Sequence, residues 1–167
     1  MEEFRYDTYC GLYCGACEIM KAYRENKGTP ASQWEDLPKP MRENIAKAEI
    51  VCRGCKTDVL FAGCQRCRIR KCAKERGVAA CIVCEEYPCK IVKGTMEHIS
   101  KGREQLPHTK VMFKNLDAVK TGGVGLWLKE QRSKWQCRQC GAAISWYQSS
   151  CERCGCELES QKDYNNY

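Results

Sequence analysis

Sixteen of the 167 residues are cysteine, and this number constrains the fold more than any other feature of the chain. The hydrophobic fraction of 43% includes these cysteines. Without them, roughly a third of the chain is apolar, which is little for the core of a protein of this size. We therefore expect bound metal to supply part of the folding free energy.

The chain contains no apolar run long enough for a transmembrane helix, so no membrane association is expected. It opens with the polar and acidic sequence MEEFRYDTYC, which argues against a secretory signal. We expect a cytoplasmic protein whose thiols stay reduced, because disulfides are rare in that compartment. The cysteines then indicate metal sites rather than a disulfide framework.

The strongest motif is a pair of CxxC knuckles near the C-terminus. Cys137-x2-Cys140-Gly141 is followed ten residues later by Cys151-x2-Cys154-Gly155. Four convergent thiolates are typical of a closed structural zinc site, with rubredoxin-like iron as the alternative. The glycine after each knuckle allows a positive φ. Cys156 is left over, as a free thiol or an alternative ligand.

The residues between the two knuckles, 143–147, are apolar and aromatic and resemble a strand. We therefore predict a zinc ribbon with a short polar tail over residues 134–167, after a cysteine-rich helical metal-binding domain over 1–133. The knuckle spacing also resembles that of small zinc fingers that bind single-stranded RNA or ubiquitin. In that case Trp146 and Tyr147 would offer stacking surfaces for RNA bases.

Eleven further cysteines lie in the first 90 residues, and each is a candidate metal ligand. They are Cys10, Cys14, Cys17, Cys52, Cys55, Cys64, Cys67, Cys72, Cys81, Cys84 and Cys89. Eleven ligands can make two four-ligand sites and a third site with three thiolates, completed by His98, His108, water or another ligand. Both zinc and [4Fe-4S] clusters fit such sets, and spacing does not give the pairing. We expect His98 and His108 to be surface helix residues rather than ligands.

Two patterns within these cysteines suggest further organisation. The spacing Cys10-x3-Cys14-x2-Cys17 is that of radical-SAM enzymes, but the chain is too short for the barrel that such enzymes need. The run Cys64-x2-Cys67-x4-Cys72 recurs 17 residues later, at 81–89, with identical spacing. This repeat indicates two similar half-sites, unless it is a chance match among so many cysteines.

The cysteine-free stretches predict short helices. They are expected at 17–27, 40–49, 68–76, 88–103, 107–120 and 126–134, with Ser32 and Glu35 as a capping box for a short turn. Met112, Leu116 and Val119 share one helix face, and Gly122 should end that helix. The expected fold class is a small metal-stabilised α+β protein, mostly short helices and loops around cysteine sites.

The net charge of +7 is concentrated in the middle of the chain. Residues 52–134 hold 18 basic and 8 acidic side chains. Six basic residues between 66 and 76 are interleaved with Cys67 and Cys72. They either neutralise thiolate charge or form a surface for nucleic acid or an acidic protein partner. The partner itself is unknown from the sequence.

Longer motifs in the first half of the chain resemble a cysteine-rich family of unknown function that is common in anaerobic bacteria and in archaea. They are CGLYCGAC (10–17), CRGC (52–55) and CRIRKCAKERGVAACIVCEEYPC (67–89). The resemblance covers roughly residues 8–92 and includes Ile69, Arg70, Tyr87 and Pro88. It implies that the shared cysteines bind metal, and the anaerobic setting of the relatives favours iron–sulfur somewhat.

These observations favour a metal-stabilised binding or adaptor protein with structural thiolate-ligated zinc. An iron–sulfur redox or sensor protein is the first alternative, and nucleic-acid binding through the basic middle and the ribbon is the second. No Ser-His-Asp set, phosphate loop or HExxH motif occurs, so no catalytic residue is predicted and enzyme activity is not expected.

Overall fold

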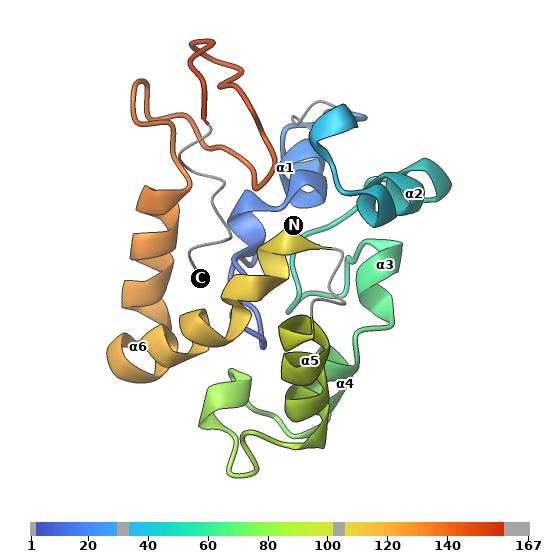
Figure 1. Cartoon of the computed structure of the whole chain (residues 1–167), viewed down its shortest axis with the longest axis vertical. Coiled ribbons are helices and arrows are strands. Elements are labelled where there is room, and N and C mark those ends of the chain that lie inside the picture. Colours follow the sequence, from blue (N-terminus) through green and yellow to red (C-terminus); the bar gives the residue numbers. More distant parts are fainter. Residues whose placement is uncertain (1–2, 30–33, 102–105, 159–167) are drawn as a thin grey trace.

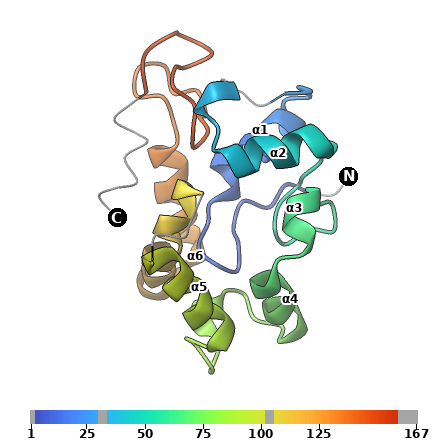
Figure 2. The ribbon, with the colours of Figure 1, turned by 45° about the vertical axis from the view of Figure 1, so that its right-hand side comes forward.

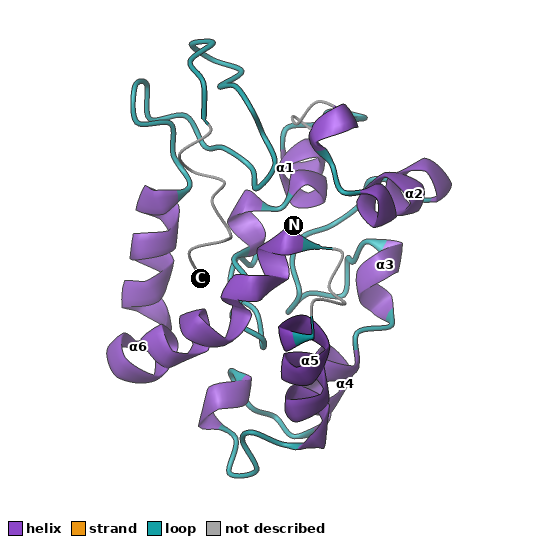
Figure 3. Ribbon diagram, viewed as in Figure 1, coloured by secondary structure: helices purple, strands orange, loops and turns teal. Residues whose placement is uncertain are grey.

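Short helices joined by loops make up the chain in a computed structural model that describes residues 3–29, 34–101 and 106–158 (Figures 1 and 3). The α-helices are α1 (Glu18–Arg24), α2 (Lys39–Lys47), α3 (Ala62–Gln65), α4 (Arg68–Glu75), α5 (Lys90–Ser100) and α6 (Met112–Lys134). Four 3-10 helices join them: η1 (Cys14–Ala16), η2 (Trp34–Asp36), η3 (Cys81–Val83) and η4 (Pro107–Val111). The predicted mixture of short helices and loops is confirmed.

The β component of the predicted α+β class is much smaller than expected. Within the described residues there is no strand, and β pairing is limited to isolated antiparallel bridges between Gln136 and Ala143 and between Ser150 and Glu157. The predicted strand over 143–147 is therefore wrong. Its first residues pair with 135–136, where Ile144 N–H donates to the carbonyl oxygen of Trp135 at 3.0 Å. Its later residues bond to the N-terminal part of the chain, where Trp146 N–H donates to the carbonyl oxygen of Ala16 at 2.9 Å.

Most helix ends follow the expected signals. Helix α1 departs from them, because it stops at Arg24 rather than continuing to Lys27. Asn26 adopts φ 54° and Lys27 N–H donates to the carbonyl oxygen of Ala22 at 2.8 Å. This is the geometry of a left-handed C-terminal cap, with asparagine in the usual place of glycine. The proposed capping-box residue Ser32 lies outside the described residues.

Helix α6 is bent, as Figure 1 shows. Gly123 has φ 76° and ψ 166°, which interrupts the helical backbone. Two helices were predicted here with a stop at Gly122, so the break lies one residue later than expected. The predicted buried face is confirmed, because Met112, Leu116 and Val119 are all buried.

One apolar core runs from the N-terminal segment into the C-terminal loops. Tyr13 packs edge-on against Trp127 of α6, with ring centroids 6.2 Å apart. The same core includes Ala16, Trp146 and Leu158. It therefore extends on both sides of the boundary proposed near residue 133.

Polar contacts also join the C-terminal loops to α1. Tyr147 N–H donates to Glu18 Oε1 at 2.6 Å, and the Glu18 side chain is fully buried. Lys21, also on α1, forms an ion pair with Glu152 at 2.7 Å. In Figures 1 and 2 these loops, orange to red, lie beside the blue α1. The first turns of α1 thus position the segment between the knuckles.

The helices of the described residues are too short or too polar to cross a bilayer. None of them combines the length and the apolar character that a membrane span requires.

Candidate metal centres

Four cysteines near the C-terminus converge as a single-ion site requires. The ligand atoms of Cys137, Cys140, Cys151 and Cys154 all lie within 4.8 Å of one another. The Sγ atoms of Cys137 and Cys154 are 3.6 Å apart, and those of Cys140 and Cys151 are 3.5 Å apart. Tetrahedral zinc with bonds of about 2.3 Å places its sulfurs about 3.8 Å apart. This quartet can therefore hold one metal ion.

The backbone of both knuckles has the same local geometry. Gly141 and Gly155 have φ 72° and 74°, as predicted from their positions after the second cysteine. Each glycine N–H donates at 2.8 Å to the carbonyl oxygen of the first cysteine of its knuckle. The backbone N–H of Cys140 bonds to the sulfur of Cys137 and lowers the pKa of that thiol to about 6. The backbone N–H groups of such turns favour the thiolate, the form that binds metal. Burial and the neighbouring thiols nevertheless raise the pKa of Cys140 and of Cys154 above the usual value.

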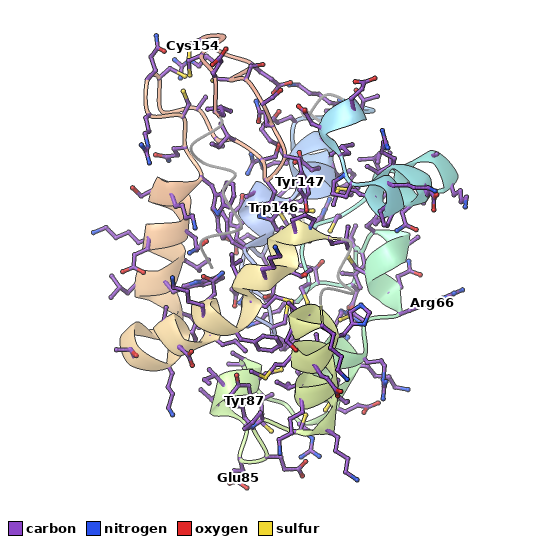
Figure 4. All side chains as sticks on the ribbon, viewed as in Figure 1. Arg66, Glu85, Tyr87, Trp146, Tyr147 and Cys154 are labelled. Carbon is purple, nitrogen blue, oxygen red and sulfur yellow. The ribbon has the colours of Figure 1, made fainter. Side chains whose placement is uncertain are left out.

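Cys156 adds a fifth sulfur beside this quartet. Its Sγ lies 3.2 Å from that of Cys137. Cys154 lies at the outer end of the C-terminal loops, whereas Trp146 and Tyr147 lie at their inner end (Figure 4). Cys154 thus lies away from Trp146 and Tyr147, although Glu152 of the same knuckle contacts α1.

A second group of seven cysteines lines one cavity of about 220 Å³ in the N-terminal part of the chain. We call it the sulfur cavity. Its cysteines are Cys10, Cys14, Cys17, Cys52, Cys55, Cys64 and Cys67. Met20, Phe61 and Trp146 supply apolar parts of its wall. The structure thus gathers the whole CxxxCxxC motif, the CRGC motif and the first two cysteines of the apparent repeat around one space.

The sulfur cavity differs from the C-terminal quartet in the spacing of its ligands. In the described part of the chain, the quartet is the one set of three or more His, Cys, Asp or Glu ligands whose atoms all lie within 4.8 Å. No three of the sulfurs around the cavity therefore lie within 4.8 Å of one another. They surround a space far larger than the 10–15 Å³ that a single water needs.

Burial opposes ionisation of the cavity thiols in the absence of a cation. Burial, together with the neighbouring Cys52, raises the pKa of Cys17 far above its usual value. Burial and the charges of Cys10 and Cys67 raise the pKa of Cys55 to about 12. A bound cation would reverse this preference, because it stabilises the thiolate directly.

The remaining four of the eleven cysteines in the first 90 residues line a separate, smaller pocket. Cys72, Cys81, Cys84 and Cys89 surround a space of about 20 Å³ together with Arg76 and Tyr87. Figure 4 shows Tyr87 at the end of the molecule opposite Cys154. All fifteen predicted ligands thus lie in three places: the sulfur cavity, this pocket and the C-terminal quartet.

The apparent repeat is not a structural repeat. Cys72 lies inside α4, whereas its counterpart Cys89 is the residue before α5. Cys64 and Cys67 line the sulfur cavity, whereas Cys81 and Cys84 line the smaller pocket. The prediction of two similar half-sites is therefore wrong. What the two runs share is a local turn, in which Cys67 N–H donates to the carbonyl oxygen of Cys64 at 3.2 Å and Cys84 N–H to that of Cys81 at 3.1 Å.

His108 is the site residue that the sequence pattern did not reveal. It was expected on the surface but is 5% exposed and lines the sulfur cavity. Burial lowers its pKa to about 3, so its imidazole is neutral near pH 7. His98 lies exposed on α5, as expected. No local pattern distinguishes the two histidines, because the partners of His108 lie almost forty residues away.

The basic residues of α4 and its flanks are largely engaged within the protein. Arg70 donates to the carbonyl oxygens of Cys55 and Thr57 at 2.8 and 3.1 Å. Lys74 and Arg76 form ion pairs with Asp58 and Glu86. Arg66 is exposed at the periphery (Figure 4). Much of this positive charge is thus paired with nearby carboxylates and carbonyl oxygens, beside the cysteines.

The proposed RNA-stacking surface is not available. Trp146 and Tyr147 are 5% and 6% exposed and pack within the core. Stacking on a nucleic-acid base needs an exposed aromatic face. The expectation that these residues bind RNA is therefore wrong.

Comparison with known proteins identifies one family. The model of a family described as "Protein of unknown function (DUF3795)" matches residues 6–94, just over half of the chain. The match includes the sulfur cavity cysteines and the smaller pocket and ends before η4. Searches of curated proteins and of solved structures found no match.

Proposed function

The chain belongs to this family of unknown function, and we propose that it is an iron–sulfur redox or sensor protein whose C-terminal site is structural. In this proposal the sulfur cavity holds the iron–sulfur chemistry. The C-terminal quartet holds one zinc ion, which stabilises the loops that contact α1. Residues 1–133 and 134–167 are then two units with different metal chemistry.

The observation that carries the proposal is the contrast in ligand spacing between the two sites. The quartet brings its sulfurs within 4.8 Å, which suits one ion. Seven cysteines instead surround a cavity of about 220 Å³. Thiolates that bind different irons of a cluster are held apart by the cluster's own iron and sulfide, so a cluster needs a larger cage than an ion.

The surroundings of the cavity support the same proposal. The apolar wall formed by Met20, Phe61 and Trp146 limits access of water, one of the levers that sets the potential of a cluster. Arg70 binds the carbonyl oxygen of Cys55 and so brings a positive charge beside the cavity. An oxidised four-iron cluster with four thiolates carries a charge of −2, which such a group stabilises.

A structural zinc protein acting as a binding or adaptor module is the second candidate. The pocket of Cys72, Cys81, Cys84 and Cys89 supports it by size, because a space of about 20 Å³ is small for a cluster. Its ligand atoms, like those of the sulfur cavity, do not all lie within 4.8 Å of one another. Zinc in all centres would make the protein colourless and redox-silent. The two candidates therefore differ in measurable properties of the purified protein.

Metal analysis of protein purified without oxygen tests the proposal. We expect at least four irons with matching acid-labile sulfide, at least one zinc, and absorbance near 400 nm that falls on reduction. Cys17→Ala should remove iron and leave the zinc of the quartet, because Cys17 lines the cavity and lies outside the quartet. Cys154→Ala is the matched control and should remove that zinc. A colourless protein with zinc only would favour the adaptor function instead.

A further inference from the structure

We infer that His108 is a metal ligand, and that its Nε2 atom completes the ligand set of the sulfur cavity. This inference rests on the proposed metal in that cavity. It concerns a histidine outside the matched family segment, on η4, and it corrects the expectation of a surface role. The evidence is the way in which neighbouring side chains hold the imidazole ring.

Two aromatic side chains fix the orientation of the ring. The ring atom Nδ1 of His108 lies 2.6 Å from the hydroxyl oxygen of Tyr147. The backbone N–H of His108 donates to the same oxygen at 3.2 Å. The indole ring of Trp146 is stacked on the imidazole, with centroids 4.0 Å apart and planes 11° apart. One edge and one face of the ring are thereby occupied by the C-terminal loops.

The Nε2 edge is left for the cavity. Nε2 makes no hydrogen bond to any described residue, although His108 is only 5% exposed. In a cavity lined by seven thiols, a metal is the partner that both the ring nitrogen and the thiols share.

The contacts behind the ring have the form expected for a histidine ligand. Metal-binding histidines donate their second ring N–H to an oxygen that fixes the tautomer, and Tyr147 provides such an oxygen. Tyr147 N–H in turn donates to Glu18, the residue directly after Cys17. Trp146 N–H donates to Ala16, the residue directly before Cys17. The histidine and the cysteine motif are thus positioned by one network.

The number of ligands gives an independent argument. Seven thiolates are one short of two four-ligand sites. His108 is the histidine that lines the cavity, and it raises the set to eight. Replacing a thiolate by a neutral imidazole makes a cluster less negative, and in Rieske centres this raises the potential. The histidine would therefore set the potential of the cluster that it binds.

The test uses the whole chain and its two histidines. Protein is labelled with ¹⁵N-histidine, purified without oxygen and reduced with dithionite, and its nitrogen couplings are measured by pulsed EPR. We expect a coupling from a directly bound histidine in the unmodified protein. It should disappear in His108→Gln and persist in His98→Gln, the matched control at an exposed position. The unmodified protein alone gives the first answer, so the test does not depend on folding of a variant.

Each outcome has a separate meaning. A reduced cluster with no histidine coupling, or a coupling that survives in His108→Gln, would overturn the role of His108 and leave the proposed function intact. Absence of iron from the cavity would overturn the proposed function and this inference together. If the cluster resists reduction, Mössbauer spectra of the oxidised protein should still show one iron site distinct from the all-sulfur sites, and its absence would contradict the inference.

Discussion

Gly54, in the CRGC motif, shows how a single residue can hold the cysteine ligands in place. It has φ 122°, and a Cβ atom there would collide with the backbone carbonyl oxygen of Arg5. The neighbouring Arg5 N–H donates to the carbonyl oxygen of Arg53 at 2.8 Å. The close approach of these two segments positions Cys52 and Cys55 at the sulfur cavity, and only glycine permits it.

We predict that Gly54→Ala lowers the free energy of unfolding by at least about 2 kcal/mol, because it adds backbone strain and a collision with backbone. It should also lower the iron content. Gly94→Ala in α5 is the control, because a Cβ there meets nothing within 4 Å. That change should be neutral or stabilise by up to about 1 kcal/mol. Urea unfolding of both variants provides the measurement, and equal effects would contradict the role of Gly54.

Single residues also mark the limit of sequence-based prediction. The cysteines could be singled out because their number and spacing are typical of metal-binding sites. His108 could not, because its burial depends on Trp146 and Tyr147, which the fold brings to it from almost forty residues further along the chain. Because the same contacts bury the two aromatic residues, the expectation that they bind RNA is also wrong. Long-range packing of this kind leaves no local sequence pattern.

At the scale of elements, local signals predicted helices better than strands. Gly77 follows α4 with φ 65°, and Pro40 lies in the first turn of α2, which are the positions that these two residue types favour. The apolar run 143–147 satisfied the pattern of a strand, but within the described residues its β pairing is limited to the bridge between Ala143 and Gln136. Its polar backbone groups bond to Ala16 and Glu18 instead. The apolar pattern of a segment indicates that it is buried, whereas the tertiary fold decides which segment it bonds to.

The contacts of 143–147 with Ala16 and Glu18 lead to a prediction about how loss of the C-terminal ion affects the rest of the protein. Cys154→Ser should remove the C-terminal ion and loosen the loops, because the quartet then lacks one ligand. Hydrogen exchange should rise at Trp146 and Tyr147 and at the adjoining start of α1. Amides of α4 should keep their protection, because α4 makes none of these contacts. A uniform loss of protection that includes α4 would contradict the two-unit organisation.

At the scale of the whole molecule, the fold sorts the cysteines into sets that spacing alone did not give. Seven line the sulfur cavity, four line the smaller pocket, and five lie in the C-terminal loops. The repeat of spacing between 64–72 and 81–89 pointed to a different grouping, because sequence spacing does not record which side of a helix faces which site. The C-terminal quartet was predictable because its two knuckles have glycines that fix their turns.

In our proposal the protein holds two kinds of thiolate centre. X-ray absorption at the iron and zinc edges of one sample, purified without oxygen, tests this most directly. We predict iron with sulfur neighbours and a short iron–iron distance, and zinc with sulfur neighbours at about 2.3 Å and no second metal. Zinc in every centre and no iron would contradict the proposal, because the sulfur cavity would then hold the same chemistry as the quartet.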